Sequence, residues 1–532
     1  MRKSTLTFIF SAAVMPTLAN IGDLPQNPST NLITDPLPSA ERVTLVKTGL
    51  GFIRIDDELD ALPSDGSLTR MVRGEDKIYL GNIFSWADDP GWIEGTVEGD
   101  KAIFRLPQLI KDEIRDINGI LTPYSYYAVA CDMVVRGGSA DMVPTVDQTY
   151  TFIIKEDGSL VPEDDELFIG NFLFSDNNWE WNMDGDFYTA LSPQSLKAID
   201  TPADVQFIPM VLSYPHILYG GAYAKEVQVG FSGNDCYVKG LAVGIGDLQD
   251  AVVKGELADN GKVISFESNQ FLGDSWLFGF TQFLIGGETE YVEDPRLGYR
   301  PRFTPMDRLE FAYDPSARSM TSDMSFIIVP SLQEDTDNLY YENIYNSPSI
   351  CYSDPEDKIR TLVNPELNAF TPAADGMPNI LDFAVSMVSA DHHLLDMTKL
   401  YFEIYIDGEP FEFTPAIDPA LKEPASRILF GTTDYECFVA QEGIIQMVAI
   451  PDMQINSMSL RLVYLGDPEN PLFSDFVTVR SNAVEGIVDA SATTEGYTDL
   501  SGRRVENPTP GIYIRTIRSS DGSVRHEKTL VR

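Results

Sequence analysis

The fold is set by a pattern in residues 77–108, which read KIYLGNI (77–83), WIEGTV (92–97) and KAIFRLPQ (101–108). Apolar residues alternate along these segments and glycine-containing turns separate them, which is typical of short β-strands. The pattern returns as CYVKGL (236–241), VVKGEL (252–257) and KVISFESNQ (262–270), at offsets of 158 to 162 residues. Two copies so far apart predict two related β-domains rather than a solenoid, whose units are shorter.

The repeat continues beyond these segments, since Phe152 parallels Phe311 at an offset of 159 residues. One stretch of the first copy departs from strand periodicity. Within residues 109–119, Ile110, Ile114 and Ile117 have helical spacing and Asn118-Gly119 supplies a stop. We therefore expect a helix there.

A third β-domain follows the two repeats. Residues 364–480 hold about seven strand-like segments, and Asp407-Gly408 between two alternating apolar segments predicts a hairpin. This number of strands fits a sandwich of the immunoglobulin or fibronectin type. Its core contains Leu400, Phe402, Ile404 and Ile406 or the alternate set, and the sequence leaves both open.

The two ends of the chain have the patterns of targeting segments. Residues 1–19 have a basic start, an apolar run and small residues before Asn20, as in a secretory signal peptide. Residues 20–40 are rich in Pro, Asn, Ser and Thr and are expected to form a linker. At the other end, Ser501-Gly502, residues 508–511 and Asp521-Gly522 predict turns between short strands.

This last segment resembles the C-terminal sorting domain of Bacteroidota proteins exported by type IX secretion. The matching residues are Tyr497, Leu500, Gly502, Arg503, Gly511, Tyr513, Ile514, Lys528 and Arg532. The resemblance covers residues 488–532 and implies engagement of an outer-membrane secretion machinery, followed by release or attachment at the surface. The two repeats also look like β-repeats of secreted proteins from gut Bacteroidota, a resemblance that implies architecture and location but no activity.

Together these patterns predict an all-β chain. We expect two related β-sandwich-like repeats, an immunoglobulin- or fibronectin-type sandwich and a small C-terminal β-domain. The expected boundaries are 1–19 (signal peptide), 20–40 (linker), 41–196 and 197–345 (repeats), 346–482 (sandwich) and 483–532 (C-terminal domain).

Charge restricts the partners. The 532 residues include 38 Lys+Arg and 81 Asp+Glu, a net charge of −43, which argues against nucleic acid and anionic membranes because phosphate would be repelled. No internal stretch is apolar enough to span a bilayer. The last 33 residues, from Leu500, carry seven basic and three acidic residues, a net of +4, so the rest carries −47. The acidic part is typical of a soluble extracellular protein, and the basic C-terminal end is typical of a separate targeting segment.

Motifs of catalysis are absent from the sequence. There is no GxSxG, GxxxxGK[ST], GxGxxG or HExxH pattern. A Ser-His-Asp triad would need His216, His392, His393 or His526, and we interpret His392-His393 as a solvated loop. Paired carboxylates carry no specific signal among 81 acidic residues. The four cysteines, at positions 131, 236, 351 and 437, are far apart, so we expect buried free thiols, with one or two disulfides as the alternative.

One cluster stands out as a candidate ligand platform. Trp179 and Trp181 lie two residues apart and share a face of an extended chain. Short oxygen-bearing side chains surround them: Asp176, Asn178, Asp184 and Asp186. Oxygen-rich loops suit Ca²⁺ and flat aromatic faces suit sugar rings, whereas the alternative is a structural Trp pair in a strand and turn. No other cofactor is expected.

These observations favour an exported, non-enzymatic protein of the cell surface or medium. It would bind or present extracellular glycan or protein through loops on β-domains. The alternatives are a secreted hydrolase, a glycosidase or protease with accessory β-domains, and a passive spacer.

Overall fold

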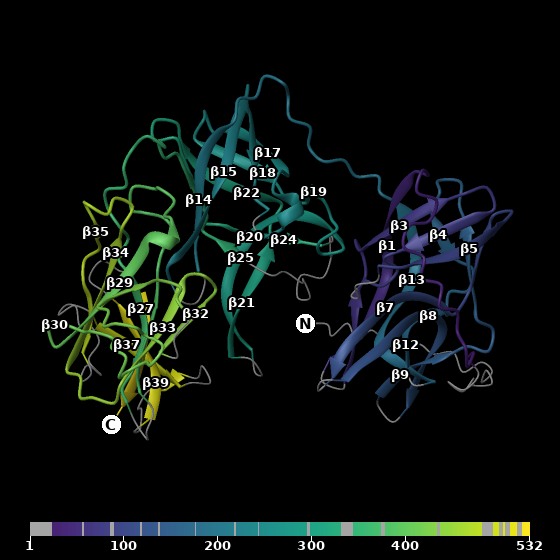
Figure 1. The fold of residues 1–532 in the computed structure, drawn as a ribbon. Coiled ribbons are helices and arrows are strands. Elements are labelled where there is room, and N and C mark those ends of the chain that lie inside the picture. Colours follow the sequence, from purple (N-terminus) through teal and green to yellow (C-terminus); the bar gives the residue numbers. More distant parts are fainter. Residues whose placement is uncertain are drawn as a thin grey trace.

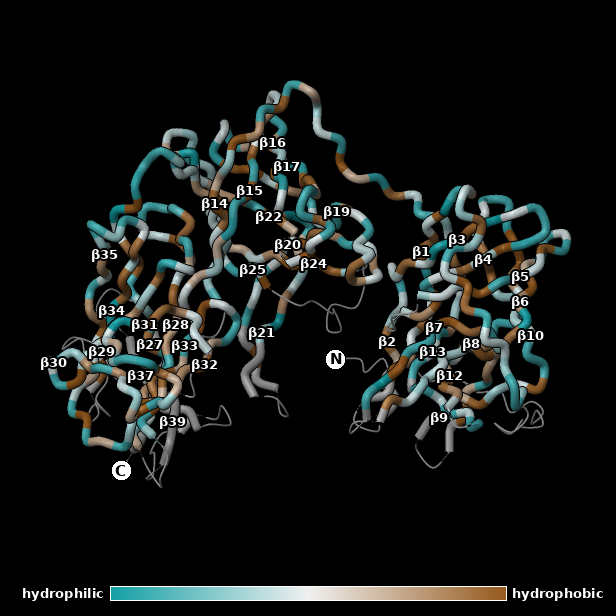
Figure 2. The backbone as a smooth tube through the Cα atoms, viewed as in Figure 1, coloured by the Kyte–Doolittle hydropathy of each residue, from teal (hydrophilic) through white to brown (hydrophobic). Residues whose placement is uncertain are grey.

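The computed structural model describes residues 24–55, 58–85, 90–117, 120–136, 139–175, 177–216, 220–242, 244–294, 298–330, 344–373, 378–433, 437–480, 493–499, 504–505, 511–518 and 524–531. Within these ranges the chain is all-β, and its helical elements are two single turns, Gly246–Leu248 and Met397–Lys399. The expected fold class is confirmed. Apolar residues gather along the strands and hydrophilic residues in the connections (Figure 2).

The first repeat is a closed ring of eight strands. Its path runs β1-β3-β4-β5-β6-β10-β11-β13, and it closes because β1 also pairs with β13. The strands are β1 (Arg42–Ile55), β3 (Leu68–Arg73), β4 (Lys77–Gly81), β5 (Trp92–Glu98), β6 (Lys101–Arg105), β10 (Thr149–Ile154), β11 (Leu160–Pro162) and β13 (Asn178–Pro193).

The second repeat is also a closed barrel, with the order β14-β15-β16-β17-β18-β22-β23-β26. Its strands are β14 (Ile208–Pro215), β15 (Ala222–Ser232), β16 (Asp235–Lys239), β17 (Val252–Ala258), β18 (Val263–Glu267), β22 (Arg308–Asp314), β23 (Ser319–Thr321) and β26 (Ser349–Cys351). The expected boundary after residue 345 falls short of this unit, because β26 completes the ring. Ring closure leaves no free strand edge within either ring, which makes the rings more closed than a sandwich.

The two barrels have the same strand register at their repeated glycines. Gly95 lies opposite Phe104 and Gly255 lies opposite Phe266. At each glycine an added Cβ would stand 2.9 Å from the phenylalanine ring, so only glycine lets that ring lie flat on the neighbouring strand. The repeated glycine seen in the sequence is therefore a packing requirement of the barrel wall.

Each barrel carries further strands. In the first repeat they are β2 (Glu58–Pro63), β7 (Gln108–Ile117), β8 (Ile120–Arg136), β9 (Ser139–Pro144) and β12 (Phe168–Ser175). In the second repeat they are β19 (Gln270–Ser275), β20 (Phe280–Asp294), β21 (Gly298–Pro305), β24 (Ser325–Val329) and β25 (Ile344–Asn346).

The helix expected over residues 109–119 is wrong, because β7 forms an antiparallel hairpin with β8. Lys111, Glu113 and Arg115 alternate along β7, and Glu113 forms ion pairs with both cations. Ile114 is 70% exposed, so the helical spacing of the isoleucines does not describe a buried face. Lys111, Glu113 and Arg115 instead recur at every second position, as residues on one face of a strand do.

The third domain has two sheets that share one hydrophobic core. One contains β27 (Glu366–Thr371), β28 (Asn379–Ala384), β33 (Ile445–Ile450) and β32 (Phe438–Gln441). The other contains β30 (Glu409–Pro410), β29 (Leu400–Ile406), β34 (Ser457–Tyr464), β35 (Leu472–Phe473), β31 (Arg427–Leu429) and β36 (Val477–Arg480). Of the two core sets left open, Leu400, Phe402, Ile404 and Ile406 are the buried ones.

A separate four-stranded sheet lies at the C-terminal end (Figure 1). It contains β37 (Thr493–Asp499), β38 (Arg504–Val505), β39 (Gly511–Arg518) and β40 (Val524–Val531).

Neighbouring units join through backbone hydrogen bonds near the start of the second ring strand of each barrel. At the start of β3, the Leu68 amide donates to Gly279 (2.8 Å), and the Thr281 amide donates to Gly66 (2.8 Å). At the start of β15, the Met387 amide of the third domain donates to Ala222 (2.7 Å). Each barrel thus uses the entry to its second ring strand to contact the next unit of the chain.

Candidate ligand-binding site

The duplication separates residues that build the barrel from residues that serve another role. Gln108 illustrates the first kind: its amide accepts from Glu94 N (2.6 Å) and donates to Glu94 O (2.7 Å) and Arg105 O (3.0 Å). Gln270 makes the same three bonds with Lys254 and Glu267, at 2.8, 2.8 and 2.9 Å. A residue with the same partners in both barrels belongs to the scaffold.

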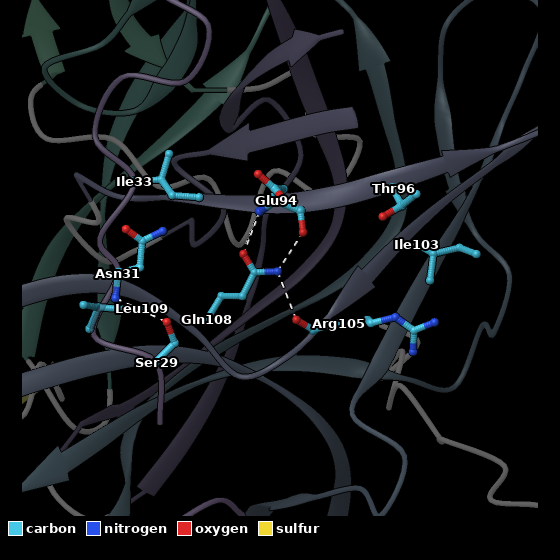
Figure 3. Close-up of a pocket in the computed structure, with 9 residues that line it drawn as sticks. All are labelled: Ser29, Asn31, Ile33, Glu94, Thr96, Ile103, Arg105, Gln108 and Leu109. Atoms are coloured by element: carbon cyan, nitrogen blue, oxygen red, sulfur yellow. Dashed lines mark hydrogen bonds between the residues drawn. The ribbon is translucent and has the colours of Figure 1, made fainter. Parts of the chain in front are cut away.

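A cavity of 280 Å³ surrounds Gln108 in the first barrel. Figure 3 shows the residues that line it. Asn31 and Ile33 of the segment before β1 lie on one side of Gln108, and Thr96, Ile103 and Arg105 lie on the other. The hydrogen bonds between Gln108 and Glu94 hold β5 to the first residue of β7. The centre of this cavity is therefore a repeated structural feature of the barrel.

A second cavity, of 180 Å³, lies where the two repeats meet. Its lining residues come from both barrels: Arg70, Gly81, Asn82, Pro90, Gly91, Trp92 and Trp276. Trp276 belongs to the connection between β19 and β20, next to the segment that bonds to the start of β3. We call this the junction pocket.

The wall that Trp92 forms in the junction pocket has no counterpart in the second barrel. An added Cβ on Gly81 would stand 2.7 to 3.0 Å from ring atoms of Trp92, so the indole lies directly on the strand backbone. The register places Val252 and Lys239 at the equivalent positions of the second barrel. A barrel of this type therefore forms without that tryptophan and glycine.

Arg70 supplies the cationic part of the junction pocket. Its guanidinium lies 4.2 Å from the centre of the Trp276 ring, a cation–π contact across the two repeats. Burial, with a smaller contribution from nearby Arg42, lowers the pKa of Arg70. Among the described residues, no carboxylate forms an ion pair with Arg70, whereas Arg42 pairs with Asp35. The pocket thus combines aromatic surface with a fork-shaped cation.

The platform expected at Trp179 is wrong in one essential respect. Trp179 is only 3% exposed, lies 4.9 Å from the ring centres of Tyr127 and Phe174, and donates its Nε1–H to Pro25 O at 3.0 Å. Trp181 is partly buried in the same core and donates to Asp184 O at 2.8 Å. A stacked sugar needs an open ring face, which Trp179 does not offer.

The polar residues of the candidate platform do not point into one common site either. Asp186 is 1% exposed and faces Lys47, whose Nζ lies 3.5 Å from its carboxylate. Asp184 is partly buried and accepts from Asn171 at 3.4 Å, Asn178 is exposed, and Asp176 lies outside the described residues. In the ranges given above, no group of three or more His, Cys, Asp or Glu side chains could hold a metal ion.

The histidines lie mainly at the contact between the second barrel and the third domain. His216 Nε2 lies 2.8 Å from the Glu442 carboxylate, and His393 Nδ1 lies 2.5 Å from Ser353 Oγ. Asp391 stands 3.7 Å from His393 Nε2, beside a cavity of 300 Å³ that Ser353 and His393 help to line. Separation in the sequence concealed this Ser-His-Asp arrangement, which corrects the interpretation of His393 as a solvated loop residue.

The cysteines follow the first expectation, because all four are buried free thiols. Burial raises the pKa of Cys236 and Cys437 to about 12, so neither is a thiolate nucleophile at neutral pH.

The sorting-like motif falls partly on described backbone. Tyr497 lies on β37, Gly511, Tyr513 and Ile514 lie on β39, and Lys528 lies on β40. Leu500, Gly502, Arg503, Arg532 and the expected signal peptide lie outside the described residues. No helix in the described part of the chain is long and apolar enough to cross a membrane.

Comparison of the chain with known protein families, curated proteins and solved structures finds no match. The candidate site therefore stands on its own geometry. Sequence reasoning missed Arg70 and Trp276, which lie 206 positions apart. The sequence alone does show that the second repeat has no tryptophan equivalent to Trp92, which indicates that the fold does not require this side chain.

Proposed function

We propose that the protein is exported to the cell surface or medium and acts there by binding extracellular glycan or protein, without catalysis. The signal-peptide pattern of residues 1–19 and the sorting-like residues 488–532 support export. The acidic charge of the preceding chain supports a soluble extracellular role.

The junction pocket is the observation that carries the binding proposal. It is a concave site with two indole rings, one arginine and one asparagine, contributed by both repeats. Pockets of this kind, with aromatic walls and a few polar groups, are the usual form of ligand sites, and they occur preferentially between domains. The second barrel forms its wall with different residues, so the fold does not require these side chains.

Replacing Trp276 with Ala tests this location. We expect the variant to lose most binding to whatever partner the unmodified protein retains on a glycan array or in a pull-down from medium, because the ring forms one wall and holds Arg70. Leu277→Ala is the matched control, since this neighbouring side chain is 68% exposed and does not line the pocket. Equal binding by both variants, with unchanged unfolding midpoints, would place the ligand elsewhere.

The alternative of a secreted hydrolase is favoured by one observation, the contact between Ser353 and His393. The arrangement differs from a catalytic triad, in which Nε2 takes the serine proton and a carboxylate orients Nδ1 through a hydrogen bond. Here Ser353 contacts Nδ1, and the 3.7 Å from Nε2 to Asp391 is too long for a hydrogen bond. This geometry is better explained as a polar contact between units.

A fluorophosphonate probe separates the two functions. We expect no covalent labelling of the full chain, because His393 lacks the orienting hydrogen bond that would activate Ser353. Labelling that disappears in Ser353→Ala, and persists in a control such as Ser316→Ala on an exposed turn, would establish the hydrolase instead.

A further inference from the structure

We infer that the junction pocket binds an acidic sugar, a uronic acid or its equivalent, whose carboxylate pairs with Arg70. The inference rests on the proposed binding function and names the chemical class of the ligand. The relevant geometry is a guanidinium whose Cζ lies over the Trp276 ring, 4.2 Å from the ring centre, at a pocket of 180 Å³.

The positive charge of Arg70 is opposite in sign to the net charge of the chain. The chain carries a net charge of −43, yet Arg70 forms no ion pair with any described residue. The Arg70 side chain is exposed on β3, as is that of Arg73, but its guanidinium is partly desolvated and lies near a second cation, Arg42, and both effects lower its pKa. An incoming carboxylate would relieve this situation, because burial strengthens a charge-assisted hydrogen bond and the attraction offsets the repulsion between the arginines.

The shape of Arg70 favours a carboxylate in particular. A guanidinium presents its donors as a planar fork that matches the two oxygens of a carboxylate. The cation–π contact places Arg70 Cζ over the Trp276 ring and forms no hydrogen bond with the indole, so it does not consume the N–H donors of the guanidinium. The contact with the indole restricts the Arg70 side chain before a ligand arrives, so less side-chain freedom is lost on binding.

The rest of the lining suits a sugar better than an acidic peptide. Trp276, which is partly exposed, supplies apolar surface for the carbon face of a pyranose ring, whereas Trp92 is only 5% exposed and lines the pocket as a buried side chain. Asn82 is held by its Nδ2 donating to Leu68 O at 2.6 Å, so its carbonyl is positioned as an acceptor for a hydroxyl. The volume is below the roughly 300 Å³ at which drug-sized sites begin, so the pocket admits one ring rather than a folded chain.

The second barrel provides a substitution that the fold tolerates. By strand register, Gln228 occupies the position equivalent to Arg70. Arg70→Gln removes the charge and installs a side chain that the related barrel already accommodates. Arg73→Gln is the matched control, since Arg73 is an exposed cation on the same strand that does not line the pocket.

The test is titration calorimetry of the full chain with oligogalacturonate and with the neutral galactose oligomer of equal length. We expect binding of oligogalacturonate alone, weakened about tenfold or more by Arg70→Gln and by the fork-less Arg70→Lys, and unchanged in Arg73→Gln. Because the contact is ionic, affinity should also fall as salt increases.

Three results would overturn the inference. Binding of the neutral oligomer but not of galacturonate or glucuronate oligomers would refute the acidic sugar and leave the proposed binding function intact. Arg70-dependent binding of an aspartate tetrapeptide without uronate binding would assign the pocket to protein partners. No binding in these titrations, on a glycan array or in a pull-down would refute the binding function as well.

Discussion

Replacing Asp186 with Ala will destabilise the first barrel by about 3–5 kcal/mol, because it removes the carboxylate that faces a buried lysine. Lys47 is 0% exposed and Asp186 is 1% exposed. The carboxylate lies 3.5 Å from Lys47 Nζ and accepts from Ser85 through its amide (3.0 Å) and its hydroxyl (2.8 Å). Chemical denaturation of the full chain, followed by tryptophan fluorescence, measures the loss.

The second barrel indicates how this loss can be reversed. The strand register places Leu212, also 0% exposed, at the position equivalent to Lys47. A barrel of this type therefore closes around an apolar residue there. The double variant Lys47→Leu with Asp186→Leu should recover most of the stability lost in Asp186→Ala, because no buried charge remains.

Ser85→Ala serves as the control for the hydrogen bonds alone, and we expect it to lose about 1–2 kcal/mol. An Asp186→Ala variant within about 1 kcal/mol of the unmodified protein would contradict the assignment of a buried ion pair. These contacts also explain why Asp186 is not part of a ligand platform. Its carboxylate already has Lys47 and Ser85 as partners, so it does not face a ligand.

The sequence predicted local features well because they depend on neighbours in the chain. The alternation in β29 and the Asp407-Gly408 turn follow from strand geometry, and both residues of that turn have positive φ, 51° and 90°. The Gly95–Phe104 contact joins strands connected by a short turn, so its repetition as Gly255–Phe266 was visible in the sequence.

Features that depend on distant pairing were not predictable in this way. Ring closure pairs β1 with β13, so that Leu45 lies opposite Pro193 across 148 positions, and no local pattern encodes it. The junction pocket has the same origin. Trp179 attracted attention because polar residues surround it in the sequence, yet its exposure is decided by Pro25, which accepts its hydrogen bond across 154 positions.

Removing residues 488–532 should abolish delivery of the protein to the surface or medium of its host, the second large effect that we expect. The physical reason is that the segment is separable from the acidic body: from Leu500 onward it is net +4, against −47 for the preceding chain. Its strands β37–β40 form a sheet of their own among the described elements. Cell fractionation with immunoblotting of the intact and shortened chains measures delivery.

The essential control is the stability of the shortened chain. Because no described strand of the barrels or of the third domain pairs with β37–β40, the unfolding midpoint of residues 20–487 should match that of the longer protein. Retention in the cell with an unchanged midpoint would then assign an address function to the tail. A shortened protein that reaches the surface as before would remove the sorting interpretation. The junction pocket would be untouched by that result, since its residues all lie between Arg70 and Trp276.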